Sequence, residues 1–224
     1  MDKVLVSLSG GLDSSTALAI AVHRHPNAEI QAISLDYGQR HAKEMDQAKL
    51  VAAHFGVAHK IIKLPNIPKS MLTDTSQSVP NCSYGDIVGV SPTYVPFRNG
   101  LMLATLASMA SPQPNSDDNA FIYFGAHAED AENDAYPDCR MDFIGTMGAA
   151  IYIGSYHRVR LHAPLIAMSK AEVVKAGTTY GTPFGLTWSC YKGEELHCGV
   201  CPTCLARKEA FRSADIADPT IYAA

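Results

Sequence analysis

A turn rich in glycine and hydroxyl side chains lies near the start of the chain, and its residue types suit phosphate binding. The turn reads SGGLDS from Ser9 to Ser14 and directly follows the apolar run from Val4 to Leu8. Two glycines let the backbone come close to a phosphate, and the helix expected after them offers free N–H groups and a positive dipole end. The turn lacks the Gly-Lys-Ser/Thr ending of a Walker A loop and the spacing of a GxGxxG loop. We predict an anion-binding loop; a plain strand-to-helix turn with a capping side chain is the alternative.

Four of the six cysteines lie close together toward the other end of the chain. Cys190, Cys198, Cys201 and Cys204 form the pattern C-x7-C-x2-C-x2-C. Four thiolates with two short spacings suit a closed, tetrahedral zinc site without a catalytic position. An iron–sulfur cluster is the main alternative, because C-x2-C-x2-C also occurs in ferredoxins, but their usual fourth Cys followed by Pro is missing. We therefore predict a structural Zn²⁺ that ties the last helix and Trp188 to the sheet.

Composition and charge exclude several classes of protein. The chain has 224 residues, of which 47% are hydrophobic and 18% charged, so disordered, collagen-like and coiled-coil proteins are excluded. The formal net charge of -4 gives no overall positive field, so we do not expect a nucleic-acid partner. No apolar run approaches the ~20 residues that span a bilayer, and the short apolar run at the amino terminus is expected to form a first strand rather than an export signal. We expect a cytoplasmic enzyme or binding protein with no membrane contact.

Segments typical of strands and helices alternate along most of the chain. We expect strands over 4–8, 30–35, 58–64, 120–124 and 159–162, and helices over 16–24, 42–55, 98–109, 142–152, 170–180 and 205–212. This alternation predicts an α/β fold with a doubly wound, Rossmann-like parallel sheet and helices on both faces. Ser169 and Glu172 predict a capping box at one helix start, and Gly181 predicts the end of that helix. The long irregular segment 65–96 is expected to form a lid or a subunit contact.

The glycine turn and five later segments together resemble one family. SGGLDS resembles the SGGxDS fingerprint of the PP-loop ATP pyrophosphatases. The later segments are DYGQRH (36–41, with Glu44 after it), VPFRN (95–99), YPDCR (136–140), PL with SKAE (164–172), and SCY with CGVCPTC (189–204). In this order they look like the 7-cyano-7-deazaguanine synthases, the QueC family. One such motif alone is weak evidence for a family, but six motifs in the same order over nearly the whole chain are specific evidence.

The resemblance implies an ATP-dependent C–N ligase. Such synthases convert 7-carboxy-7-deazaguanine with ammonia to the 7-amide and then to 7-cyano-7-deazaguanine, through adenylated intermediates. They release AMP and pyrophosphate or its hydrolysis product. A carboxylate is a poor electrophile, and adenylation converts one of its oxygens into part of a leaving group. The resemblance also implies Mg²⁺ and a homodimer. It divides the chain into an ATP-binding PP-loop domain, 1–185, and a zinc-binding element with the terminal helix, 186–224, packed on that domain.

The resemblance also assigns the nucleotide site. The residues expected to hold ATP are Leu8, Ser9, Gly10, Gly11, Leu12, Asp13, Ser14, Ser15, Arg40 and His41, with Asp13 near the magnesium ion. Positive side chains must stabilise the charge that develops on pyrophosphate, and Lys170 and Arg98 are the candidates. Three alternatives remain open here. Lys170 could be an exposed residue beside its helix cap, Arg98 could form a surface salt bridge, and Arg40 with His41 could cap a helix without touching a ligand.

The segment from His127 to Arg140 is the predicted substrate site. Carboxylates can accept hydrogen bonds from a guanine-like edge, so Asp138, with Tyr136 and Arg140 beside it, is the candidate contact; a solvated acidic loop is the alternative. Cys139 is expected to be a buried structural thiol rather than a nucleophile.

The same segment departs from the family pattern. His127 stands where the family commonly has Asn, and the segment is longer than usual. An enzyme that couples the adenylated deazaguanine acid to a partner protein, instead of ammonia, is therefore a second hypothesis. A tRNA-thiolating PP-loop enzyme is a third, but it predicts a basic face that the sequence does not show.

Overall fold

Parallel strands form a single sheet in the computed structural model, which describes residues 2–39, 43–64, 70–74, 76, 81–83, 91, 93–113, 118–129, 136–192 and 195–224. The strands of the described part are β1 (Lys3–Ser7), β2 (Glu29–Asp36), β3 (Ala58–Lys63), β4 (Ala120–Tyr123) and β5 (Val159–His162). Their order is β3-β2-β1-β4-β5, and all neighbours are parallel. The chain order reverses between β1 and β4, and open parallel sheets bind ligands beside such a point.

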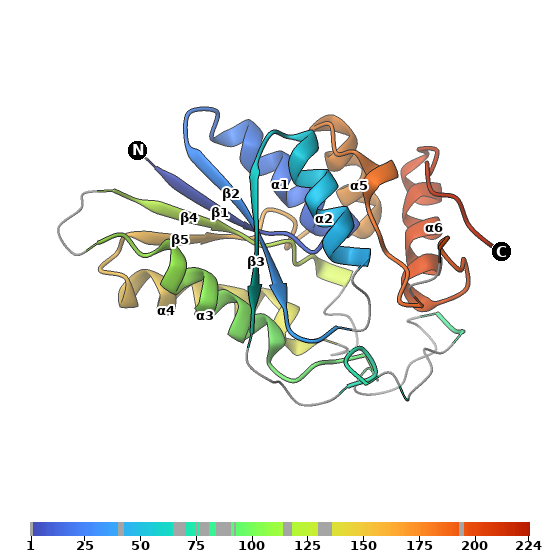
Figure 1. Cartoon of the computed structure of the whole chain (residues 1–224), viewed down its shortest axis with the longest axis horizontal. Coiled ribbons are helices and arrows are strands. Elements are labelled where there is room, and N and C mark those ends of the chain that lie inside the picture. The colour runs from blue at the N-terminus through green and yellow to red at the C-terminus, as the bar shows by residue number, and fades with distance from the viewer. Residues whose placement is uncertain are drawn as a thin grey trace.

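Helices cover both faces of this sheet (Figure 1). The helices are α1 (Leu12–Arg24), α2 (Lys43–His54), α3 (Arg98–Ala110), α4 (Met141–Gly154), α5 (Lys170–Thr179) and α6 (Pro202–Ala214), with short 3-10 turns at Pro137–Cys139 and Phe184–Leu186. One hydrophobic core joins α1, α2, α5 and α6 to the sheet, and a second joins α3 and α4 to its other face. The expected doubly wound α/β fold is confirmed.

The central strand β1 contributes to both cores. Val4 and Val6 pack into the first core and Leu5 into the second, and all three are fully buried. A strand with helices on both faces is apolar at successive positions. This explains why the first apolar run of the sequence is continuous, and it fixes the point at which the glycine turn leaves the sheet.

Most predicted elements are confirmed, but two helices begin earlier than expected. α1 begins at Leu12 rather than at residue 16, because two of its first polar residues bond locally: Ser14 Oγ accepts the Ser9 N–H at 3.1 Å, and Thr16 Oγ1 donates to the Leu12 carbonyl at 2.9 Å. α6 begins at Pro202 rather than at residue 205, with the proline in the first turn, where its missing N–H costs nothing. The capping box of Ser169 and Glu172 is present, as predicted.

Several predictions fall partly or wholly outside the described residues. Arg40 and His41 lie outside them, as does most of the segment 65–96. The boundary between 185 and 186 stays a prediction, although Phe211 of α6 shares a core with α1 and α5.

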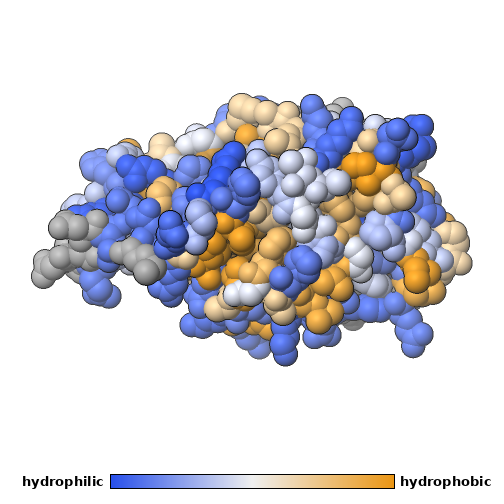
Figure 2. Space-filling view, turned by 90° about the horizontal axis from the view of Figure 1, so that it is seen from above, coloured by the Kyte–Doolittle hydropathy of each residue, from blue (hydrophilic) through white to orange (hydrophobic). Residues whose placement is uncertain are grey.

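The surface over α1, α2 and α5 mixes polar and apolar residues (Figure 2). No helix in the described part of the chain is long and apolar enough to cross a membrane.

Candidate functional site

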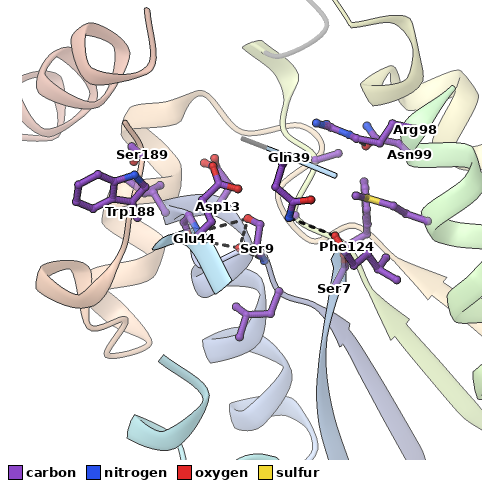
Figure 3. Close-up of a pocket in the computed structure, with 18 of the residues that line it drawn as sticks. Ser7, Ser9, Asp13, Gln39, Glu44, Arg98, Asn99, Phe124, Trp188 and Ser189 are labelled. Atoms are coloured by element: carbon purple, nitrogen blue, oxygen red, sulfur yellow. Dashed lines mark hydrogen bonds between the residues drawn. The ribbon is translucent and has the colours of Figure 1, made fainter. Parts of the chain in front are cut away.

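A pocket opens at the carboxyl ends of β1, β2 and β4 (Figure 3). It is lined by the glycine turn, by the starts of α2, α3 and α5, and by the segment that leads to the first clustered cysteine. In the view of Figure 3, Trp188 and Ser189 lie on one side and Arg98 and Asn99 on the other, with Ser9, Asp13 and Glu44 between them. The fold therefore places most of the predicted nucleotide residues around one pocket.

The glycine turn is packed so tightly that side chains would not fit at two positions. Gly10 has a φ of +83°, and a Cβ there would lie 2.5 Å from the Glu44 carbonyl oxygen and 2.7 Å from the Ala48 nitrogen. A Cβ at Gly125, just after β4, would lie 2.9 Å from the Ser14 nitrogen. Glycine at these positions lets the turn sit directly against the start of α2 and the end of β4.

Hydroxyl groups hold the turn in shape without capping α1. The Ser9 N–H donates to Ser14 Oγ at 3.1 Å, and the Gly11 N–H donates to Ser9 Oγ at 3.3 Å. Gly11 is the N-cap of α1, and among the described residues no side chain caps this helix start. The first N–H groups of a helix have no partner within it, so this start offers donors and a positive dipole end to an anion.

The start of α5 borders the same pocket but is fully capped. The Ser169 N–H donates to Glu172 Oε2 at 2.8 Å, and the Glu172 N–H donates to Ser169 Oγ at 3.3 Å. The Lys170 N–H donates to Glu129 Oε1 at 2.7 Å. The uncapped start of α1 is therefore the better candidate for anion binding, and α5 borders the pocket with its Lys170 side chain.

Lys170, Asp13 and His127 form a cluster that we call the lysine end of the pocket. Lys170 Nζ lies 3.4 Å from Asp13 Oδ2 and 3.2 Å from His127 Nε2. His127 Nε2 lies 3.7 Å from Asp13 Oδ1, and the His127 side chain is 1% exposed. The Lys170 side chain is 15% exposed, so the alternative of an exposed lysine is wrong. The sequence marked His127 only as a departure from the family pattern; its contact with Lys170 depends on the fold.

A second group of side chains, which we call the arginine end, consists of Tyr37, Arg98 and Asn99 together with Glu44, which lies between Asp13 and Arg98 in the view of Figure 3 and interacts electrostatically with Arg98. Arg98 donates to the Tyr37 hydroxyl at 3.4 Å and to Asn99 Oδ1 at 3.2 Å. Among the described residues its hydrogen bonds therefore do not go to a surface carboxylate. Burial raises the pKa of Tyr37, and it raises the pKa of Glu44 to about 7 although Arg98 opposes the second shift. Glu44 lies in a matched segment, but sequence reasoning gave it no role.

The predicted substrate residues surround this end without lining the pocket. Asp138 is buried, and its Oδ2 accepts the Asn99 N–H at 2.9 Å. Tyr136 makes hydroxyl contacts with Ser91 and Thr93, while Arg140 pairs with Asp142 at 3.0 Å on the surface. Asp138 thus anchors the start of α3, and the substrate roles of Tyr136, Asp138 and Arg140 stay predictions.

Cys139, between these residues, lines the pocket as a buried thiol. It is 6% exposed, and Asn99 Nδ2 donates to its sulfur at 3.1 Å. The expectation of a buried thiol is confirmed.

The four clustered cysteines fit a single metal ion. Their sulfur atoms all lie within 4.8 Å of one another, and all four residues are buried. Thiolates around one tetrahedral ion with bonds of ~2.3 Å stand about 3.8 Å apart, and Cys198 Sγ lies 4.0 Å from Cys204 Sγ. In a cubane iron–sulfur cluster each thiolate binds a different iron, which spreads the sulfurs further.

Backbone N–H groups point at these sulfur atoms. Cys190 Sγ accepts from the Lys192 and Cys198 N–H groups, both at 3.4 Å, and Cys198 Sγ accepts from the Cys201 N–H at 3.3 Å. Hydrogen bonds from Cys190 and Cys204 lower the pKa of Cys201. Donors of this kind stabilise thiolates, which are the form that binds metal.

The cysteine cluster is connected to the wall of the pocket. The Trp188 N–H donates to the Gly10 carbonyl at 2.8 Å, and the Trp188 indole N–H donates to the Cys190 carbonyl at 2.8 Å. Fully buried Arg207 of α6 donates to Thr187 Oγ1 at 2.7 Å and pairs with Asp218 at 3.1 Å. The glycine turn therefore contacts a segment that is joined to the cysteine cluster and to α6.

Comparison with known proteins identifies the family. A family model described as queuosine biosynthesis protein QueC matches residues 3–215. The chain belongs to this family. The 7-cyano-7-deazaguanine synthase of Thermoplasma volcanium is 41% identical, covering 98% of this chain and 90% of the relative. That of Pseudoalteromonas atlantica is 39% identical, covering 99% of both. Its membership makes the chain a ligase-type enzyme of the QueC family with a small-molecule substrate.

Solved structures resemble the QueC chain less closely. The NMN synthetase of Francisella tularensis is 12% identical with a TM-score of 0.44, covering 96% of this chain and 87% of that one. The tRNA thiolase NcsA of Methanococcus maripaludis is 17% identical with a TM-score of 0.48, covering 95% and 65%.

Proposed function

We propose that the enzyme converts 7-carboxy-7-deazaguanine with ammonia to 7-cyano-7-deazaguanine, using ATP at both steps. One observation carries the proposal: an uncapped helix start after a glycine turn shares a pocket with a half-buried carboxylate and a paired lysine. The relatives named for this synthase activity are about 40% identical over nearly the whole chain.

The lysine end suits the phosphates of ATP. The N–H groups at the start of α1 would bind the pyrophosphate portion, and Lys170 would stabilise the charge that develops there as the bond to the α-phosphate breaks. Asp13 Oδ1 is buried and has no hydrogen-bond partner among the described residues. A carboxylate oxygen is a ligand that Mg²⁺ prefers, so Asp13 would hold this ion, which supplies positive charge to the phosphates when bound. Arg40 and His41 are proposed to contact adenine or ribose.

The two steps use the same atoms of the nucleotide. A carboxylate oxygen of the acid attacks the α-phosphorus and pyrophosphate leaves; ammonia then attacks the acyl carbon, and AMP leaves with that oxygen. In the second step the amide oxygen attacks the α-phosphorus of another ATP. Loss of both protons from the amide nitrogen, together with AMP carrying the former amide oxygen, then gives the nitrile. Both steps develop negative charge on pyrophosphate, so one phosphate site serves both.

The remaining basic residue, Arg98, is proposed to orient the acyl phosphate from the arginine end. Its guanidinium is held by Tyr37 and Asn99, so it is fixed before a ligand arrives. A homodimer is proposed on the family resemblance.

The cysteine centre is proposed to hold Zn²⁺ in a structural role. Four thiolates fill a tetrahedral ion, so it offers no open position for a substrate. The bonds from Trp188 to Gly10 and Cys190 mean that this centre would fix the pocket wall rather than take part in the reaction.

Product analysis tests the function. The metal-loaded enzyme is incubated with ATP, Mg²⁺, ammonium and 7-carboxy-7-deazaguanine, and small molecules and proteins are analysed by mass spectrometry. The proposal predicts the amide followed by the nitrile. Formation of neither product by the folded enzyme would contradict it. A deazaguanine-sized mass added to a protein, without free nitrile, would favour a protein acceptor instead.

A further inference from the structure

Among the described residues, the pocket is lined by two carboxylates, Asp13 and Glu44, and two cations, Arg98 and Lys170. Asp13 lies against Lys170 at 3.4 Å. Arg98 lies near Glu44, but it donates its hydrogen bonds to Tyr37 and Asn99. The Glu44 carboxylate therefore borders the pocket with no hydrogen-bond donor among the described residues.

The position of Glu44 is fixed by the main chain. It is the second residue of α2, and its carbonyl oxygen would lie 2.5 Å from a Cβ at Gly10, so the start of α2 packs against the glycine turn. The side chain is half-buried, and burial raises its pKa to about 7. A carboxylate removed from water without donors is unfavourable, and a ligand that supplies N–H groups would remove this cost.

The two bases that the proposed reaction brings to the pocket differ in the donors they present. The pairing edge of adenine carries one amino group beside a ring nitrogen that accepts. The corresponding edge of a 7-deazaguanine carries a ring N–H beside an amino group, so two donors face the two oxygens of a carboxylate. A carboxylate is attracted by the second edge and repelled by the accepting nitrogen of the first.

We propose that Glu44 is the specificity-determining residue that binds the N–H and amino edge of the deazaguanine acid. This inference rests on the proposed function. The reacting carboxyl group of the deazaguanine acid is on the five-membered ring, away from the N–H and amino edge. Binding of that edge by Glu44 therefore keeps the carboxylate of the acid apart from the Glu44 carboxylate. Asp138, the acceptor predicted from the sequence, already accepts the Asn99 N–H through Oδ2, whereas Glu44 keeps both oxygens available within the described structure.

The test replaces the acceptor without changing its shape. In Glu44→Gln one oxygen becomes an amino group, which would face a donor of the ligand. Steady-state kinetics are measured with 7-carboxy-7-deazaguanine and with an analogue that lacks the 2-amino group, together with the KM for ATP. The matched control is Glu29→Gln. Glu29 is exposed at the amino end of β2, whereas the pocket lies at the carboxyl ends of the strands.

We expect Glu44→Gln to raise the KM for the acid by about 10- to 100-fold and to leave the KM for ATP unchanged. The wild type should prefer the acid over its analogue, and the variant should lose most of that preference. An unchanged KM for the acid, or a raised KM for ATP instead, would overturn the proposal. If Glu44→Gln does not fold, Glu44→Asp, which keeps the charge but shortens its reach, is expected to raise the same KM. A wild type that makes no product would contradict the proposed function rather than this inference.

Discussion

The two ends of the pocket differ in how their charged groups are paired. At the lysine end, Lys170, Asp13 and His127 lie within 3.7 Å of one another beside an uncapped helix start. At the arginine end, Arg98 is bound to neutral partners and Glu44 has no donor among the described residues. In the proposed reaction the lysine end would stabilise the charge that develops on pyrophosphate, and the arginine end would keep an acceptor that recognises the base. The difference between the ends would then separate the chemical step from the selection of the base.

Loss of the proposed Zn²⁺ should have the largest effect and should act mainly on the lysine end. Structural zinc contributes on the order of 10 kcal/mol in small domains, so chelation or Cys201→Ser should unfold the cysteine element. The Trp188 bond to Gly10 would then be lost, and ATP affinity should fall more than affinity for the acid. Trp188 is the single tryptophan, so its fluorescence reports the change directly.

The control for the metal experiment is Cys82→Ser, because Cys82 lies outside the cluster. This variant should keep its metal content and melting temperature. A Cys201→Ser protein that melts like the wild type would show that the centre does not support the pocket.

Replacing Lys170 tests the chemistry of the lysine end alone. Lys170→Ala should lower kcat for pyrophosphate release by about 100- to 1000-fold, because it removes a positive group at the developing charge. The fold should persist, since α5 keeps its capping box. Stopped-time assays of pyrophosphate measure the loss. Lys175→Ala, on the exposed face of the same helix, should keep full activity, and equal rates for both variants would refute the assignment.

Replacing Asp138 tests the framework of the arginine end. Asp138→Ala removes a charged acceptor of the Asn99 N–H, so the free energy of unfolding should fall by about 1–3 kcal/mol even without substrate. Denaturant titration gives this value. Asp142→Ala is the control, because Asp142 pairs with Arg140 on the surface and should matter little. Unchanged stability of Asp138→Ala would leave Asp138 free for a direct substrate contact.

The smallest expected effect is a pH dependence of stability due to Glu44. Its pKa is about 7 in the folded enzyme and near the ordinary 4.5 when unfolded, so the folded state binds the extra proton. Its contribution to stability is therefore largest below pH 4.5 and is lost as the pH rises through 7. Arg98 stays charged and Tyr37 stays neutral across this range.

Glu44→Gln should remove this dependence in the ligand-free enzyme. Wild type and Glu44→Gln should have similar free energies of unfolding below pH 4.5. The variant should become the more stable of the two as the pH rises through 7. Denaturant titrations across this range measure the gap. If the free energies of unfolding of the two proteins change with pH in the same way, burial of the ionised Glu44 carboxylate does not destabilise the fold.

The glycine turn and Lys170 of the lysine end could be predicted from the sequence, because local residues mark each of them, but the contact of Lys170 with Asp13, 157 positions away, could not. The glycine turn follows a strand directly, and Lys170 follows a capping residue, so each is marked by its neighbours. The four cysteines are also marked by their spacing. Local patterns likewise fixed the strands and most helices.

The contacts of the arginine end could not be predicted either, because they depend on which partner each side chain meets in the fold. The bond from Asn99 to Asp138 joins residues 39 positions apart and gives Asp138 a contact at the start of α3 that the sequence did not predict. The acceptor role of Glu44 becomes visible only when Arg98 is seen to bind Tyr37 and Asn99 instead.

The most direct test of the central claim follows the oxygen atoms of the acid. The enzyme is given 7-carboxy-7-deazaguanine with both carboxylate oxygens labelled with ¹⁸O, together with unlabelled ATP and ammonium, and AMP is analysed by mass spectrometry. Adenylation at both steps predicts two AMP molecules per nitrile, each carrying one labelled oxygen. Formation of ADP, or of AMP without label, would contradict the account.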